Sequence, residues 1–391
     1  MRISIIGGGG RVGLPLAIAL ASKQHEVVVI DKDINRVKKI NERIMPFHEL
    51  GAEDELKKIP SEYLEATDKD IAISDSEVCI LVIGTPVLDD GTPTSDDLVT
   101  LVSGIIPNLK TVKLLMLRST VYPGLTIKLQ KILNDFNLNT KISYCPERIA
   151  EGSAMEELYK LPQIIGADDA VSQKISSKVF EGISSSIVFT SILEAELTKL
   201  FANSYRYIKF AIANEFFKIA ANSGASWEKI WQALKLDYPR AADIPLPGFA
   251  AGPCLVKDTI QLDFFASPTF KLGKIAIEIN EEFPDYLVSY LGQHYDLSKL
   301  TIGILGMTFK QDVDDFRSSL SFRLRRILIG KAKKVLCSDP LLTKSYFVGR
   351  VELIENSDIV IIATPHKEYS EMIFDQPVID IWRISSSKSL I

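Results

Sequence analysis

The chain has 391 residues, of which 46% are hydrophobic and 24% charged, and its formal net charge is −5. This length suffices for two or three domains, and the composition is that of an ordinary globular protein. Because Lys and Arg are not in excess and no apolar run is long enough to span a bilayer, we expect neither nucleic acid nor a membrane as a partner.

The first half of the chain alternates short β-rich runs with segments of helical period. We expect buried strands at residues 3–6, 26–30, 78–83, 113–117 and 142–144. Strands that alternate with helices are typical of a parallel sheet with helices on both faces.

The pattern changes to helix in the middle of the chain and returns to alternation at Leu300. Helices are predicted at 191–223 and 227–235, then a turn-rich stretch at 238–253 and a further helical region at 258–294. Further strands are predicted at 301–305, 334–337, 359–362 and 378–381. Residues 76–86 also resemble 357–365, since each has a polar start, a buried run and a final Thr-Pro.

These elements predict an α/β protein with three domains. Two Rossmann-like, doubly wound parallel-sheet domains, at 1–190 and 296–391, are joined by a central all-α region at 191–295 built around a long helix. The alternative for the internal resemblance is two unrelated strands of similar composition.

A glycine-rich turn follows the first predicted strand. Gly8, Gly10 and Gly13 fit G-x-G-x-x-G, a helical run follows, and the second strand ends in Asp31. Such glycines let the backbone approach a pyrophosphate, and the acid binds the ribose hydroxyls. Because this carboxylate would repel a 2′-phosphate, we predict NAD rather than NADP. A structural turn with a surface aspartate is the alternative, and it needs all these features to coincide by chance.

Two side chains of the predicted long helix are candidate catalytic residues. Lys199 and Asn203 are four positions apart, so they share one face of the helix. A Lys donor beside an Asn amide can hold an oxyanion or a water, although this spacing alone is more often a solvated surface.

Cysteine usage singles out one thiol. The four cysteines form no C-x-x-C pair, which argues against zinc and against a disulfide framework and favours the cytoplasm. Cys254 follows a turn-forming stretch and opens a predicted helix, with Lys257 close by. A helix N-terminus and a cation both favour thiolate, so we predict Cys254 as a nucleophile, against the commoner role of a small buried hydrophobe.

Together with further segments, these residues resemble the UDP-glucose/GDP-mannose dehydrogenase family, the nucleotide-sugar 6-dehydrogenases. The resemblance covers nearly the whole chain in the right order. It rests on residues 8–15, Asp31 with Arg36, 84–86, 119–121, 145–148 with 151–152, 196–203, 254–258, 309–312 and 315–319.

The resemblance implies roles for individual residues. The implied cofactor contacts are Gly8, Gly10, Arg11, Val12, Gly13, Asp31, Arg36, Thr85, Thr120, Glu151 and Arg317. The implied catalytic set is Cys254 as the thiol, Lys199, Asn203 and Asp258 for oxyanions and water, Glu147 as general acid/base, and Thr120. The implied substrate contacts are Glu147, Arg148, Lys199, Asn203, Arg240, Phe249, Lys257 and Lys310, with the last domain covering the nucleotide.

The reaction that the resemblance implies is a four-electron oxidation of a sugar C6 alcohol by two NAD. The aldehyde is captured by Cys254 as a thiohemiacetal, oxidised to a thioester and hydrolysed to the acid. The resemblance also implies a UDP-sugar as the substrate, no metal, and a homodimer or higher homo-oligomer through the long helix.

Three departures from the family pattern stand out. The glycine turn contains one extra glycine. Pro253 precedes Cys254 where the family usually has Ser or His, and it supplies no hydrogen-bond donor. Near the end of the chain the D-x-R motif becomes Asp380-Ile381-Trp382-Arg383, so an arginine contact is shifted or lost.

The choice of sugar rests on short motifs. Residues 145–148 and Tyr238-Pro239-Arg240 resemble the N-acetylhexosamine branch, whereas residues 151–154 resemble the glucose branch. We favour UDP-N-acetylmannosamine or a related UDP-hexosamine, with UDP-glucose next.

Two other functions compete with this one. A two-electron hydroxyacid dehydrogenase also combines a Rossmann domain, a helical domain and K-x-x-x-N, but it leaves Cys254 and the last domain without a role. A nucleotide-sugar-binding homologue that has lost catalysis is suggested by Pro253 and Trp382.

Overall fold

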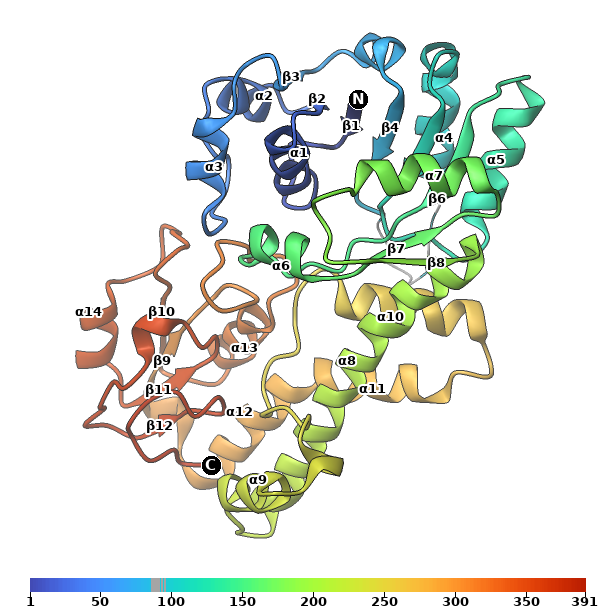
Figure 1. Ribbon diagram of the computed structural model, residues 1–391. Helices are drawn as coiled ribbons and strands as arrows, with labels where there is room; N and C mark the ends of the chain where they lie inside the picture. Colours follow the sequence, from blue (N-terminus) through green and yellow to red (C-terminus); the bar gives the residue numbers. More distant parts are fainter. Residues whose placement is uncertain (86–91, 93, 95) are drawn as a thin grey trace. The chain divides into compact units, whose positions relative to one another are not determined.

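The computed structural model describes residues 1–85, 92, 94 and 96–391 (Figure 1). The chain forms two compact units, Met1–Ala202 and Asn203–Ile391. The three-domain division stays a prediction, and Pro86 of the predicted Gly84-Thr85-Pro86 motif lies outside the described residues.

The first unit is built on an eight-stranded sheet in the order β3-β2-β1-β4-β5-β6-β7-β8. Its strands are β1 Arg2–Ile6, β2 Glu26–Ile30, β3 Leu64–Thr67, β4 Val78–Leu81, β5 Leu114–Leu117, β6 Lys141–Tyr144, β7 Gln163–Gly166 and β8 Ile187–Thr190. Its helices are α1 Gly13–Ser22, α2 Ile34–Asn41, α3 Ala52–Lys58, α4 Asp96–Ile105, α5 Leu125–Asp135, α6 Ala154–Lys160 and α7 Ala170–Val179, with short turns of 3-10 helix at η1 Asp70–Asp75 and η2 Ile106–Leu109.

Strand side chains alternate between two apolar layers, as a doubly wound sheet requires. Ile5, Val29 and Ile80 face the layer formed with α1, α3, α6 and α7. Ile6 and Leu81 face the layer formed with α4, α5 and the start of the long helix. Both faces of the sheet are therefore buried, which confirms the predicted α/β class.

The five strands predicted in this unit are confirmed, and three more were not predicted. The strand β8 is an edge strand with two exposed central residues, so it lacks the buried run on which the predictions relied. The strand β7 pairs antiparallel with β6 at Tyr144 and Gly166, which departs from the expected wholly parallel sheet. The antiparallel direction of β7 could not be predicted, because an apolar strand shows the same hydrophobic pattern in either direction.

The second unit contains a four-stranded parallel sheet in the order β10-β9-β11-β12. Its strands are β9 Thr301–Leu305, β10 Lys334–Ser338, β11 Ile359–Ile362 and β12 Val378–Ile379. Its helices are α9 Trp227–Lys235, η3 Pro239–Ala241, α10 Leu255–Ala266, α11 Lys271–Glu281, α12 Phe283–His294, η4 Leu297–Lys299, α13 Leu320–Ile329, α14 Arg350–Glu355 and η5 Lys367–Tyr369. The long helix α8, Ile192–Asn222, begins in the first unit and continues into the second.

Both predicted sheets and the helical middle are therefore present. The helical region predicted at 258–294 consists of three helices, α10 to α12. Pro268, between α10 and α11, and Pro284, at the start of α12, explain the interruptions, because proline lacks the amide that a helix interior needs.

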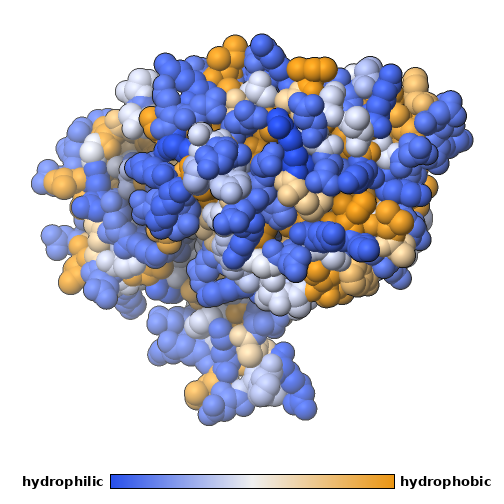
Figure 2. Space-filling view, turned by 45° about the horizontal axis from the view of Figure 1, so that its top comes forward, coloured by the Kyte–Doolittle hydropathy of each residue, from blue (hydrophilic) through white to orange (hydrophobic). Residues whose placement is uncertain are grey.

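Over the part of the chain that the structure describes, no helix has both the length and the apolarity to cross a membrane. The face drawn in Figure 2 is mainly hydrophilic, with hydrophobic side chains in separate groups.

Candidate active site

The first group of predicted residues lies at one edge of the eight-stranded sheet. The strands β1 and β4 are neighbours from which the sheet continues in opposite directions, so their carboxyl ends form the switch point where α/β proteins bind ligands. The predicted residues that follow these and the adjacent parallel strands are Gly8, Gly10, Arg11, Val12 and Gly13 after β1, Asp31 after β2, Thr85 after β4, Thr120 after β5, and Glu147 and Glu151 after β6.

The glycine turn connects β1 to α1 through tight backbone contacts. Gly7 has a φ of +74°, and its amide donates to the Ile30 carbonyl at 2.8 Å. A side chain on Gly13 would place its Cβ 2.6 Å from the Cα of Gly8. Gly7 supplies the left-handed residue with which the chain leaves the strand.

Asp31 is held against this turn. Its Oδ2 accepts a hydrogen bond of 3.0 Å from the Gly9 amide, and its Oδ1 accepts one of 3.0 Å from the Asp33 amide. Arg36 places Nη1 3.9 Å from Oδ2 of Asp31 and Nε 3.3 Å from Asp33. The N-terminus of α1 has no side-chain cap, which leaves its backbone amides to bind a pyrophosphate. The residues present therefore fit NAD.

Two further pairs of predicted cofactor residues are brought together. The Thr85 hydroxyl donates to the Thr120 carbonyl at 2.6 Å, which links the ends of β4 and β5. Arg11 places Nε 3.9 Å from Oε2 of Glu151, and its guanidinium lies 5.0 Å from the centre of the Phe47 ring. The loop after β6 is thereby tied to the glycine turn.

Glu147 is a fixed carboxylate. Its Oε2 is ion-paired with Arg118, and its Oε1 accepts from the amides of Arg148, at 2.7 Å, and Ile149, at 3.0 Å. Arg118 is itself buried and also donates to Gln163 at 2.9 Å, and burial lowers its pKa to about 10. The predicted general acid/base therefore already accepts hydrogen bonds at both oxygens, a geometry that favours anchoring of the loop after β6.

The structure reveals partners that the sequence did not predict. Arg118 contacts Glu147 across 29 residues of sequence and Gln163 across 45. Buried Glu49 accepts from the amides of Gly152 and Ala154, both at 2.8 Å, and so caps α6. No local pattern marks such pairs, because their members are distant in the chain.

The second group of predicted residues surrounds Cys254. This cysteine is exposed, forms no disulfide, and is the residue immediately before α10, at its N-cap position. Lys257 and Asp258 lie three and four positions later, on the same face of the helix. Cys254 therefore stands at a helix N-terminus, next to a turn of helix that carries Lys257 and Asp258.

Asn203 and Asp258 join α8 to α10. The Asn203 amide donates a 2.5 Å hydrogen bond to Oδ2 of Asp258, whose side chain is fully buried. Oδ1 of Asp258 accepts no hydrogen bond from the described residues, and Lys257 places Nζ 3.6 Å from it. Lys199 is mostly buried and lies one turn before Asn203 on α8. Asp258 could accept a proton, and Asn203 and Lys199 could donate hydrogen bonds to an oxyanion.

The other three cysteines are unsuited to nucleophilic chemistry. Cys79, Cys145 and Cys337 are buried, and burial raises the pKa of Cys79 to about 12 and of the other two to about 11. At neutral pH their thiols stay protonated, which leaves Cys254 as the candidate.

The remaining predicted substrate contacts differ from one another in exposure and in the groups that they contact. Arg240 is exposed in η3, with its guanidinium 5.6 Å from the Tyr238 ring centre. Phe249 is buried, 6.1 Å from Phe283 between ring centres. The carbonyl of Lys310 accepts from Thr308 at 3.1 Å.

Two arginines predicted as ligand contacts have protein partners. Arg317 is paired with Asp315, with Nε 2.9 Å from Oδ2 and 3.0 Å from Oδ1. The Arg148 side chain donates to the Pro162 carbonyl. Each is therefore positioned by a nearby acceptor before any ligand arrives.

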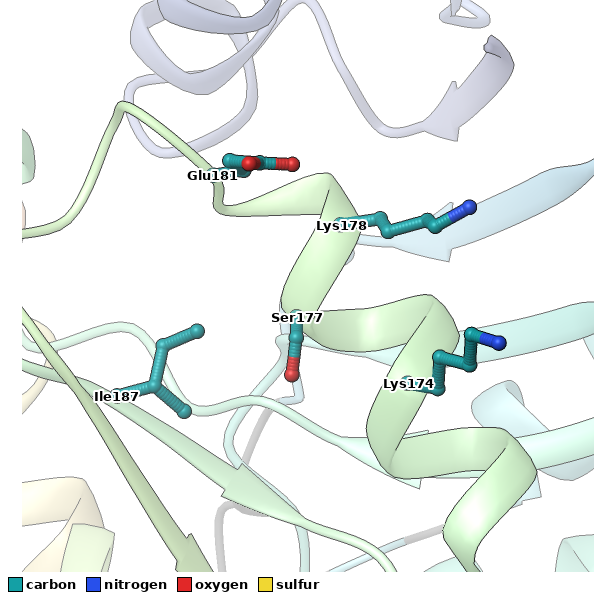
Figure 3. A pocket seen from close by; sticks show the side chains of 5 residues that line it. All are labelled: Lys174, Ser177, Lys178, Glu181 and Ile187. Carbon is teal, nitrogen blue, oxygen red and sulfur yellow. The ribbon is translucent and has the colours of Figure 1, made fainter.

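Figure 3 shows a pocket at α7 and β8, lined by Lys174, Ser177, Lys178, Glu181 and Ile187. The two lysine side chains extend to the same side and away from Ile187. None of these residues belongs to the predicted sites. In residues 1–85 and 96–391, no cluster of three or more His, Cys, Asp or Glu could hold a metal ion.

Comparison with known proteins gives a consistent result over the whole chain. Three models of the UDP-glucose/GDP-mannose dehydrogenase family match: its NAD binding domain at residues 1–184, its central domain at 193–282, and its UDP binding domain at 303–386. UDP-N-acetyl-D-mannosamine dehydrogenase of Methanocaldococcus jannaschii is 30% identical over 98% of this chain and 89% of its own length.

Other relatives differ in their named sugar. UDP-glucose 6-dehydrogenase of Rickettsia prowazekii is 26% identical over 95% of this chain and 91% of its own length. The structure of the UDP-N-acetyl-D-mannosamine dehydrogenase of Pyrococcus horikoshii has a TM-score of 0.91 and 27% identity, covering 100% of this chain and 97% of that one. This chain therefore belongs to the UDP-glucose/GDP-mannose dehydrogenase family and is an NAD-dependent nucleotide-sugar dehydrogenase.

Proposed function

We propose that this dehydrogenase oxidises the C6 hydroxyl of a UDP-sugar to a carboxylate in two NAD-dependent steps, with Cys254 holding the carbon between them. The observation that carries the proposal is the position of Cys254. It is exposed at the start of α10, on the helix face of Asp258, while the other three cysteines are buried with raised pKa values.

Bound NAD would accept a hydride from C6 in each oxidation. In the first step the alcohol also loses its hydroxyl proton and becomes an aldehyde. The Cys254 thiolate adds to the aldehyde carbon, and the oxygen takes up a proton to give a thiohemiacetal. Loss of a second hydride and that proton gives a thioester, which water cleaves to the carboxylate and the free thiol.

The buried polar groups fit the charges that this sequence produces. An oxyanion forms when the thiolate adds and again when water attacks, and Asn203 and Lys199 are the proposed donors to it. Oδ1 of Asp258 is the proposed acceptor for the proton of the attacking water, since no described residue donates a hydrogen bond to it. In this assignment Glu147 orients the loop after β6, because both its oxygens are already engaged.

The favoured sugar is N-acetylmannosamine, with glucose as the alternative. The archaeal relatives that are 29–30% identical carry the first name and the rickettsial relative at 26% the second. The motif at residues 145–148 and Arg240 point the same way. Arg240 is exposed and so available to meet a ligand.

We also propose a homodimer or higher homo-oligomer that uses the α8 surface. Ile212, Phe216 and Ile219 are 42%, 44% and 59% exposed and lie along one side of this helix. Clustered exposed apolar side chains of this kind mark association surfaces.

A count of NADH per sugar tests the reaction. A panel of UDP- and GDP-sugars is offered with NAD, and NADH and the acid product are both quantified. Two NADH per acid are expected with UDP-N-acetylmannosamine, and Cys254→Ala should make no acid. One NADH per sugar would instead support the two-electron hydroxyacid reaction. No turnover with any sugar, despite measured NAD binding, would support a non-catalytic protein.

A further inference from the structure

The segment that leads to Cys254 is fixed by contacts at two of its glycines. The Gly248 amide donates to Oδ1 of buried Asn214 at 2.8 Å, and Nδ2 of Asn214 donates to the Gly248 carbonyl at 3.1 Å. Gly252 lies against the Phe309 ring, so close that a Cβ on it would sit 2.5 Å from the ring. The backbone of this segment therefore has little freedom.

Trp382 covers the first of these glycines. A Cβ on Gly248 would lie 2.3–2.6 Å from three carbons of the indole, so the ring packs directly on the Gly248 Cα. The indole N–H donates to the Ala363 carbonyl at 3.0 Å, just after β11. The ring is thus held at one end by the sheet and presses on the cysteine segment at its other end.

Trp382 and Arg383, at the position of the altered D-x-R motif, contact different parts of the chain. Arg383 donates to the Ile391 carbonyl at 2.6 Å and has a φ of +55°, so its side chain is committed to the end of the chain. Trp382, one position earlier, contacts the cysteine segment at Gly248.

We propose that Trp382 is a positioning residue, which sets the placement of Gly248 and hence of Cys254 six residues later. This rests on the proposed role of Cys254 as nucleophile. Gly248 does not have a positive φ, so its backbone alone would accept alanine. Glycine is required at position 248 because the indole ring of Trp382 occupies the space that a side chain would need. The large Trp382 side chain therefore depends on the small residue at position 248.

A size-exchange experiment tests the pair. Gly248→Ala should displace the segment, lowering kcat by roughly 10- to 100-fold, the loss that a misplacement of up to about 1 Å produces. It should also slow alkylation of Cys254 by iodoacetamide, measured on the cysteine peptide by mass spectrometry. Adding Trp382→Ala removes the clash, so the double variant should be less impaired than Gly248→Ala in both rates and should retain only the loss that Trp382→Ala alone causes by removing the positioning contact. Gly349→Ala, where a Cβ meets nothing within 4 Å and φ is −62°, is the matched control and should behave as wild type.

Equal impairment of Gly248→Ala and the double variant would overturn the proposal, as would wild-type rates in Gly248→Ala. If Gly248→Ala does not fold, Trp382→Phe replaces it. A changed alkylation rate at an unchanged melting temperature then supports the positioning role, and an unchanged rate contradicts it. The alkylation measurement needs no turnover. If Cys254→Ala still makes acid, the proposed function fails, while the coupling between residues 248 and 382 remains measurable.

Discussion

The amide of Asn203 donates a 2.5 Å hydrogen bond to the fully buried carboxylate of Asp258, joining the long helix to the helix that Cys254 begins. We expect Asn203→Ala to leave this carboxylate without its donor and to lower the free energy of unfolding by about 1–3 kcal/mol. The kcat should fall as well, because an oxyanion donor is lost. Urea unfolding and steady-state kinetics measure the two effects.

Asn35→Ala is the control for this change, since Asn35 is exposed on α2. It should alter neither stability nor turnover noticeably. Wild-type kcat in Asn203→Ala would remove Asn203 from the proposed chemistry.

Asp31 should decide between NAD and NADP. Asp31→Asn removes the negative charge beside the Gly9 amide, and we expect the KM for NAD to rise roughly tenfold, the worth of one charged hydrogen bond. The preference for NAD over NADP should shrink, since the repulsion of a 2′-phosphate is lost. The ratio of kcat/KM for the two cofactors is the measurement. Asp33→Asn is the control, because Asn caps α2 as well as Asp does.

The Arg118–Glu147 ion pair should matter for stability. Arg118→Met leaves the buried Glu147 carboxylate unpaired, with an expected loss of about 3–5 kcal/mol. The double variant Arg118→Met with Glu147→Gln should recover part of this loss, because the buried charge is gone. Denaturant unfolding of the four proteins gives the coupling energy. Additive losses in the double variant would show that the two side chains do not interact.

Asp339 should contribute to acid sensitivity. Burial opposes its ionisation, but hydrogen bonding and attraction to His366 and the amides of Met307 and Leu341 outweigh this and lower its pKa below 3.8. Because the pKa of Asp339 is lower in the folded than in the unfolded protein, its carboxylate contributes fully to stability at pH values above the unfolded pKa. This stabilisation is lost as the pH falls through the folded pKa. Below about pH 4, Asp339→Asn should therefore lose stability less steeply than wild type. Exposed Asp375→Asn should follow the wild-type curve.

The α8 surface should control assembly. We expect Ile219→Glu, a charge placed at a 59% exposed apolar position, to shift the protein towards smaller species in light scattering coupled to gel filtration. Leu236→Glu is the control, because Leu236 is even more exposed but follows α9. An unchanged mass for Ile219→Glu would place the contact elsewhere.

Local signals in the sequence were sufficient for much of the fold. The helix Trp227–Lys235 and the strand Thr301–Leu305 have the predicted bounds, because each has a clear period and a clear break at its ends. The glycine turn and Asp31 were predicted as a unit, and the structure places them in contact.

Features that depend on distant residues could not be predicted. The direction of β7, the burial of Phe249 and the Arg118–Glu147 pair arise only when segments far apart in sequence meet. Trp382 was noted as a departure from a motif, but its contact with Gly248 spans more than a hundred residues. Hydrophobic periodicity reports local structure and carries no information about contacts between residues so far apart in the sequence.

The strand orders also bear on how the chain is made. All eight strands of the first sheet lie before residue 191, and all four of the second lie after residue 300, so neither sheet takes a strand from the other. Domains generally fold as units during synthesis, the N-terminal one first. Every backbone partner of the first sheet has therefore been synthesised before the ribosome finishes the long helix, and hydrogen bonding of that sheet need not wait for the rest of the chain.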